Sequence, residues 1–149
     1  MTHKYLKAYV EIPLGGELRK RINEEDASIY KGNAENVPAF GVVAYGCIPD
    51  YINPTDNCEA DVFIIDSHGL EIGNTVEVKI IGVHIRNNGD HKVLCAPANS
   101  TIKNLSDINS EDLQVIGKFV EKESRPGEFW AKSDVAYDWL ESLKTDGQQ

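Results

Sequence analysis

Three carboxylate residues lie within six positions near the middle of the chain. Asp56, Glu59 and Asp61 directly precede the apolar run Val62-Phe63-Ile64-Ile65. Mg²⁺ and Ca²⁺ bind through several converging oxygen ligands, and a strand fixes the directions in which its carboxylates point. The spacing is therefore compatible with a cation site at the mouth of a strand. A solvated acidic loop is the alternative interpretation.

The composition indicates one soluble globular domain over residues 1–149, because 41% of the residues are hydrophobic and 26% charged. The net charge of -9 argues against partners such as nucleic acid or an anionic membrane, since both surfaces repel an acidic protein. The segment Met1 to Lys7 lacks the apolar core of a signal peptide, so we expect a cytoplasmic location. Cys47, Cys58 and Cys95 form no CxxC pair, so neither a disulfide framework nor a thiolate zinc site is expected.

Alternating apolar and polar residues predict strands in the first two thirds of the chain. The expected strands are Tyr5–Ile12, Gly41–Ile48, Ala60–Ile65, Thr75–Ile85 and Lys92–Ala96, with a short hairpin of Arg19–Ile22 and Ser28–Tyr30. Gly46 permits a close approach of another backbone. The sequence Asn87-Asn88-Gly89-Asp90 predicts a tight hairpin, because Asn and Gly tolerate positive φ.

After Pro97 the apolar period changes from two to about 3.6, which predicts two helices. Asn109 or Ser110 can cap the first, whose buried stripe is Leu113, Ile116 and Val120 and which ends at Arg125-Pro126-Gly127. Ser133 can cap the second, whose apolar face is Val135, Ala136, Trp139, Leu140 and Leu143. Strands followed by two helices predict an α+β domain, a small β-barrel with helices packed on it.

Short motifs along nearly the whole chain occur in the order of a known family. In chain order these are Val10-Glu11-Ile12-Pro13, Tyr45-Gly46-Cys47-Ile48-Pro49, the acidic turn from Asp56 to Asp61, Ile81-Gly82-Val83, Asp90-His91-Lys92 and Pro97. This set resembles the soluble family I inorganic pyrophosphatases. The resemblance implies a five-stranded OB-like β-barrel with two C-terminal helices packed on it.

The resemblance also implies an activity, which is Mg²⁺-dependent hydrolysis of inorganic pyrophosphate to phosphate, with Mn²⁺ or Co²⁺ as other candidate cations. By position, the expected metal residues are Asp56, Asp61, Asp90 and Glu11. Lys92 and Arg19, or Lys20 in a shifted register, match phosphate-binding residues, and Tyr45 matches an active-site tyrosine. Bacterial relatives commonly assemble as homohexamers, so a homo-oligomer is expected. From the residues alone, a solvated lysine at position 92 is equally open, and for Tyr45 packing in the barrel mouth is favoured over contact with phosphate.

The chain departs from the family pattern where the chemistry is most demanding. The resemblance places the base that activates water at the middle aspartate of the acidic motif, and Cys58 stands there. Glu59 is the candidate replacement base, although consecutive strand residues face opposite sides unless the turn is irregular. Several phosphate-binding residues of the family also have no match, so weakened or altered hydrolysis is expected. The alternatives are a non-catalytic homologue that binds a phosphorylated ligand or serves assembly, and hydrolysis of a different phosphorylated substrate.

Overall fold

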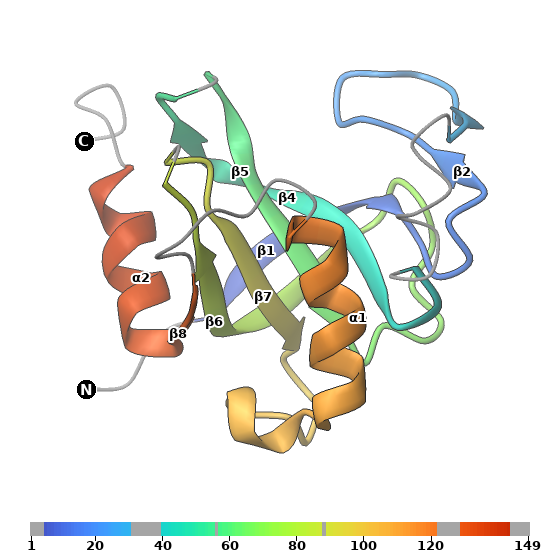
Figure 1. Cartoon of the computed structure of the whole chain (residues 1–149). Coiled ribbons are helices and arrows are strands. Elements are labelled where there is room, and N and C mark those ends of the chain that lie inside the picture. The colour runs from blue at the N-terminus through green and yellow to red at the C-terminus, as the bar shows by residue number, and fades with distance from the viewer. Residues whose placement is uncertain (1–4, 31–39, 56, 88, 122–128, 144–149) are drawn as a thin grey trace.

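The computed structural model describes residues 5–30, 40–55, 57–87, 89–121 and 129–143, with the side chains of 117–121 left out. Five strands close into a barrel: β1 (Leu6–Ile12), β4 (Val43–Asn53), β5 (Cys58–Ile65), β7 (Lys92–Pro97) and β6 (Thr75–Ile85), which pairs back onto β1. β5 and β7 run parallel, and the other neighbours in the barrel are antiparallel. The predicted α+β barrel with two helices is therefore confirmed (Figure 1).

Smaller elements flank this barrel. β8 (Phe129–Lys132) pairs with the end of β6, and α2 (Ser133–Ser142) follows it directly and lies alongside both strands (Figure 1). The short strands β2 (Leu18–Arg19) and β3 (Ser28–Ile29) form a separate hairpin. The 3₁₀ helix η2 (Leu105–Asp107) precedes α1 (Ser110–Glu121), which lies across one face of the barrel (Figure 1).

The alternation of side chains along the strands divides the apolar residues into two cores. The first core lies inside the barrel and is formed by alternate residues of all five barrel strands, for example Val10, Val62 and Val93. This alternation is expected for a closed barrel. Ala136, Leu140 and Leu143 of α2 join this core. The residues of opposite parity, such as Phe63 and Leu94, pack with Ile116 of α1 in the second core. Residues of this outward-facing set are free to build a site wherever α1 does not cover them.

Several local predictions are tested by these elements. Asn109 caps α1, because its Oδ1 accepts the backbone N–H of Asp112 at 2.8 Å. The prediction that Ser133 caps the second helix is wrong, since Ser133 is the first helical residue and Lys132 occupies the cap position without a side-chain bond. Val135, expected on the buried face of that helix, is exposed.

Two glycines are required by their surroundings. A Cβ at Gly46 would lie 1.8 Å from the carbonyl oxygen of Tyr9, which confirms the predicted close approach between β4 and β1. Gly89 has φ of +80° in the predicted hairpin between β6 and β7, where residue 88 lies outside the described residues. The expected break at 125–127 also lies outside them.

No helix within the described ranges is long and apolar enough to cross a membrane.

Candidate active site on the outer face of the barrel

The predicted site residues lie on the outward-facing side of neighbouring strands. Tyr45 and Phe63 are register partners on β4 and β5, as are Cys47 and Asp61. Because side chains alternate along a strand, Glu59 and Asp61 share the face of Phe63. A cavity of about 510 Å³ opens there, and its walls are Glu11, Arg19, Arg21, Ile22, Asn23, Glu24, Tyr45, Cys47, Cys58, Glu59 and Asp61. The β2–β3 segment thus supplies one wall and the barrel strands the other.

The turn before β5 is tied to the hairpin that carries Asp90. The side-chain Oδ1 of Asn53 accepts the backbone N–H of Thr55 at 2.9 Å. The backbone carbonyl of Asn53 accepts the backbone N–H of Asn57 at 2.8 Å. Its side-chain amide also donates to the carbonyl of Gly89 at 3.2 Å. Asn57 has φ of +60°, a conformation that Asn tolerates better than most residues. These bonds bring the mouth of β5 next to Asp90. Asp56, predicted as a metal residue, lies outside the described residues.

Lys92 joins the two described aspartates of the predicted metal set. Its Nζ lies 2.5 Å from Asp61 Oδ2 and 3.2 Å from Asp90 Oδ2. The Lys92 side chain is 10% exposed, and those of Asp61 and Asp90 are 18% and 24% exposed. Burial raises the pKa of Asp61, while Lys92 and a hydrogen bond from Tyr45 favour its ionised form. The two carboxylates therefore face one point that attracts positive charge, and the interpretation of Lys92 as a solvated strand residue is wrong.

Tyr45 is buried against Phe63, with ring centroids 5.4 Å apart, so the expected packing role is confirmed. Its hydroxyl also bonds the Asp61 carboxylate. The pKa of Tyr45 lies well above its usual value because of burial and the neighbouring charge of Asp61. Tyr45 is consequently a neutral hydroxyl at physiological pH, able to orient Asp61 by donating to it and unable to act as a phenolate base.

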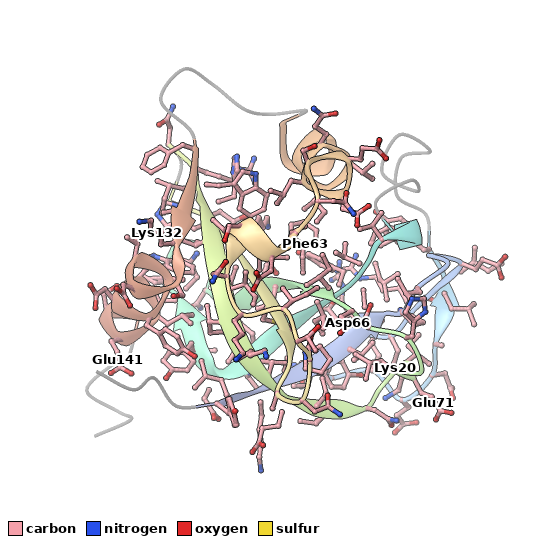
Figure 2. The ribbon with its side chains drawn as sticks, turned by 90° about the horizontal axis from the view of Figure 1, so that it is seen from below. Lys20, Phe63, Asp66, Glu71, Lys132 and Glu141 are labelled. Carbon is pink, nitrogen blue, oxygen red and sulfur yellow. The ribbon has the colours of Figure 1, made fainter. Side chains whose placement is uncertain are left out.

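Glu11 contacts a guanidinium in the structure. Its Oε1 accepts from Arg19 Nη2 at 3.2 Å and from Arg19 Nε at 3.4 Å. Burial raises the pKa of Glu11, and Arg19 opposes that shift. Of the two basic residues offered by the sequence, Arg19 lines the cavity, whereas Lys20 places Nζ 6.0 Å from the ring centroid of Tyr9. Figure 2 shows Lys20 near the edge of the molecule, well away from Phe63 in its interior.

Cys58 and Glu59 both line the cavity, although they are consecutive in β5. The local backbone is irregular here: Asn57 has positive φ, and the β4–β5 register shifts between Ile48 and Ile52. Regular alternation places Glu59 on the face of Asp61, and the irregular backbone allows Cys58 to line the same cavity. Glu59 is half-buried on the side of Asp61, and Cys58 is exposed at the strand's first position. A carboxylate thus lies beside the thiol at the position where the resemblance places a base.

The residues of the expected metal set are only partly brought together. Among the described residues, no group of three or more His, Cys, Asp or Glu side chains is arranged to hold a metal ion. Asp61 and Asp90 do converge, on Lys92. Mg²⁺ commonly keeps several waters and binds through one or two carboxylates together with substrate phosphates, so this pair of oxygen donors fits that mode of binding.

Apart from Arg19, residues of the β2–β3 segment were not predicted as part of the site. Arg21, Asn23 and Glu24 line the cavity, and Glu24 Oε1 accepts the backbone N–H of Arg21 at 2.8 Å. The alternation of basic residues at positions 19 and 21 places them on one face of an extended chain, and this was the available signal. Nothing in the local pattern indicates that this segment folds over β5.

Known proteins were compared with the chain at the level of sequence and of fold. The family model "Inorganic pyrophosphatase" matches residues 8–143. An inorganic pyrophosphatase of Saccharolobus solfataricus is 27% identical over 107 residues, which are 70% of this chain and 62% of that protein, so the match spans less than two thirds of the relative. The crystal structure of the Ehrlichia chaffeensis inorganic pyrophosphatase superposes with a TM-score of 0.75 at 18% identity, covering 96% of this chain and 95% of that one. The Helicobacter pylori inorganic pyrophosphatase gives a TM-score of 0.75 at 19% identity, covering 98% and 95%. The structures share the fold, and the family model extends over most of the chain, which therefore belongs to the inorganic pyrophosphatase family.

Proposed function

We propose that this protein hydrolyses inorganic pyrophosphate to phosphate with the help of a divalent cation, and that it does so weakly. The observation that carries the proposal is the convergence of Asp61 and Asp90 on one cationic atom, Lys92 Nζ, beside a cavity that also holds Arg19. Membership of the inorganic pyrophosphatase family supports the same activity. Pyrophosphate carries several negative charges, so a site for its hydrolysis must combine carboxylates that hold cations with basic groups that hold phosphate.

Asp61 and Asp90 are the residues that we assign to the cation, and Mg²⁺ is the ion best suited to two oxygen donors and bound phosphate. Mn²⁺ and Co²⁺ are further candidates. Proteins of this family are metal-dependent in general. A bound divalent cation neutralises phosphate charge and lowers the pKa of a bound water. Asp56 is assigned to the same group by its place in the motif alone.

The remaining groups of the cavity, and Lys92 bonded to Asp61, have distinct tasks in this proposal. Arg19 and Lys92 bind phosphate oxygens, because a guanidinium fork and an ammonium are the usual partners of phosphate. Tyr45 holds the Asp61 carboxylate in one orientation through its hydroxyl. Glu59 accepts the proton of the attacking water, a task that a half-buried carboxylate beside Asp61 can perform.

Two features of the cavity explain why the activity is expected to be weak. Cys58 stands where the family pattern has the base, and a thiol is a poor ligand for magnesium, which prefers oxygen. The cavity wall also carries four acidic residues, Glu11, Glu24, Glu59 and Asp61, against the two basic residues Arg19 and Arg21. Phosphoryl transfer depends on positioning and charge stabilisation, so a shortage of cationic groups slows the chemical step itself.

The experiment is phosphate release from pyrophosphate in the presence of Mg²⁺, Mn²⁺ or Co²⁺, with Cys58→Asp and Glu59→Gln variants beside the wild type. Cys58→Asp is expected to raise kcat at least about tenfold, because it restores a carboxylate to the position of the base. Glu59→Gln is expected to lower kcat about a hundredfold in the wild-type background. An unchanged rate in Glu59→Gln would show that Glu59 is not the base.

A second candidate function is favoured by the metal geometry, since the described residues contain no group of three or more metal-binding side chains. It is a non-catalytic homologue that binds a phosphorylated ligand or serves as an assembly subunit. Absence of phosphate release with all three cations, together with calorimetry that detects no cation binding, would favour this alternative. Release from another phosphorylated compound but not from pyrophosphate would identify a different substrate. The homo-oligomer and the cytoplasmic location stay predictions from the sequence.

A further inference from the structure

The cavity presents an electrostatic difficulty for an anionic substrate. Its wall carries more carboxylates than basic groups, as described above, and Arg19 and Arg21 are the basic groups that line it. Removing any wall carboxylate should therefore improve anion binding if only charge matters, because the local potential becomes less negative. A carboxylate whose removal weakens anion binding must act in another way, by holding a basic group in place.

Glu11 is positioned to hold Arg19. The Glu11 side chain is 9% exposed and the Arg19 side chain 29% exposed, so the acidic partner is fixed in the barrel wall while the basic partner reaches the cavity. One oxygen, Glu11 Oε1, accepts from both Nε and Nη2 of the guanidinium. The backbone strengthens this link, because the N–H of Lys20 donates to the carbonyl of Glu11 at 2.9 Å. The end of β1 thus holds β2 through both main chain and side chain.

We propose that Glu11 is a positioning residue that turns Arg19 toward the phosphate groups of the substrate, and that Glu11 is not a metal ligand. The inference rests on the proposed function, since it assigns the anion-binding group of the same cavity. A guanidinium carries five N–H donors in a rigid plane, and the contacts with Glu11 occupy one edge of it. The rest of the plane is then directed without the entropy loss of ordering a mobile arginine on binding.

The same contacts argue against Glu11 as a ligand. Oε1 of Glu11 accepts two N–H groups of one rigid guanidinium, whereas Asp61 and Asp90 each accept through Oδ2 from a single ammonium on the flexible stem of Lys92. A binding cation can displace the ammonium of Lys92 more easily than the guanidinium of Arg19, which is held at two of its nitrogens. The Lys92-linked pair of Asp61 and Asp90 is a separate ionic group with its own cation. Glu11 and the two aspartates therefore act on ligands of opposite charge. Glu11 directs a basic residue at the anion, and the aspartates attract cations.

The test compares Glu11→Gln with Glu24→Gln, which removes the same charge from the same cavity wall. Glu24 provides a matched control, because its carboxylate accepts the backbone N–H of Arg21, which a glutamine carbonyl can also accept. Calorimetry measures the affinity for inorganic phosphate at saturating Mn²⁺, and separately the affinity for Mn²⁺ alone. Circular dichroism and unfolding in urea check that each variant is folded.

Glu11→Gln is expected to weaken phosphate binding about tenfold, because a charge-assisted pair becomes a neutral hydrogen bond, whereas Glu24→Gln leaves phosphate affinity unchanged or tightens it. Mn²⁺ affinity without phosphate should stay within about twofold of the wild type in both. Tighter phosphate binding in Glu11→Gln would overturn the inference. A tenfold loss of Mn²⁺ affinity in the absence of phosphate would also overturn it, since that is the behaviour of a ligand.

Arg19→Lys provides a second route that does not depend on the stability of the Glu11 variant. An ammonium cannot reproduce the planar fork of a guanidinium, so Arg19→Lys should lower the affinity for phosphate. In the Arg19→Lys background, Glu11→Gln should lower that affinity by less than about a further twofold. Full additivity would refute the positioning role. Normal hydrolysis of pyrophosphate with unaltered phosphate affinity in Glu11→Gln would refute this inference alone. Phosphate affinities as expected without any hydrolysis would refute only the proposed activity.

Discussion

Replacement of Lys92 by methionine should destabilise the protein in a manner that depends on pH. The variant keeps an unbranched side chain of similar size and removes the ammonium that lies 2.5 Å from Asp61 Oδ2 and 3.2 Å from Asp90 Oδ2. Removing one member of a buried ion pair typically destabilises by about 3–5 kcal/mol, because a charge is left without compensation. Since both aspartates are partly exposed, at 18% and 24%, we expect a smaller loss than for a fully buried pair, about 2–3 kcal/mol at pH 8.

The sign of the pH dependence follows from Asp61. Burial raises its pKa above the unfolded value, so between those two values the folded state binds more protons and stability falls as the pH rises. Lys92 opposes this shift, and its loss raises the pKa of Asp61 further, which extends the window of falling stability upward. As the pH falls below this raised pKa, Asp61 of the folded variant takes up a proton, so the difference from wild type should shrink, to below about 1 kcal/mol near pH 4.

Unfolding in urea, followed by the fluorescence of Trp130 and Trp139 at fixed protein concentration, measures both quantities. Lys79→Met is the matched control, because Lys79 Nζ donates to the neutral carbonyl of Ser100. Its effect on the free energy of unfolding should not vary across the same pH range. A difference between Lys92→Met and wild type that is below about 0.5 kcal/mol at pH 8, or that is equal at pH 4 and pH 8, would refute the role assigned to Lys92.

Two further substitutions test the surroundings of Asp61 and the closing of the barrel. Tyr45→Phe removes the hydroxyl that donates a hydrogen bond to Asp61. The free energy of unfolding should therefore fall by about 1 kcal/mol at pH 8, and titration should show a higher pKa for the Asp61 carboxyl. No change in either quantity would contradict this hydrogen bond. Gly46→Ala places a Cβ 1.8 Å from the carbonyl oxygen of Tyr9, and because main-chain atoms must move, the loss should reach about 3 kcal/mol in the same unfolding measurement. A loss below about 1 kcal/mol would show that β1 and β4 can separate at this point at little cost.

The strands of the barrel could be predicted wherever the alternation of side chains is unbroken. The expected strand Thr75–Ile85 has the observed bounds of β6, because apolar residues recur at every second position through most of its length. β4 was expected to end at Ile48, yet it continues to Asn53, since a register shift between Ile48 and Ile52 accommodates Pro49, Asp50 and Tyr51. β8 was not expected at all. Its four residues are too few to show a period, and it exists through pairing with β6.

Some features of the candidate site could likewise be predicted from the sequence, and others could not. Cation-attracting carboxylates at the mouth of β5 could be expected from the acidic spacing, because a strand fixes where Asp61 points. The pairing of Glu11 with Arg19 could not, since it depends on how the chain turns through Gly15 and Gly16 to bring β2 beside β1. Glu59 illustrates the limit of a periodic argument: strict alternation places it opposite Cys58, and an irregular turn places both in one cavity.

The proposed function requires Asp61 to belong to a cation site at which pyrophosphate is hydrolysed. The most direct measurement is kcat/KM for phosphate release from pyrophosphate, with and without Mg²⁺, in the wild type and in Asp61→Asn. We predict measurable Mg²⁺-dependent release in the wild type and a loss of at least about a hundredfold in the variant, because a carboxylate that attracts the cation is replaced by a neutral amide. Release that is independent of Mg²⁺, or that is equally fast in Asp61→Asn, would contradict it.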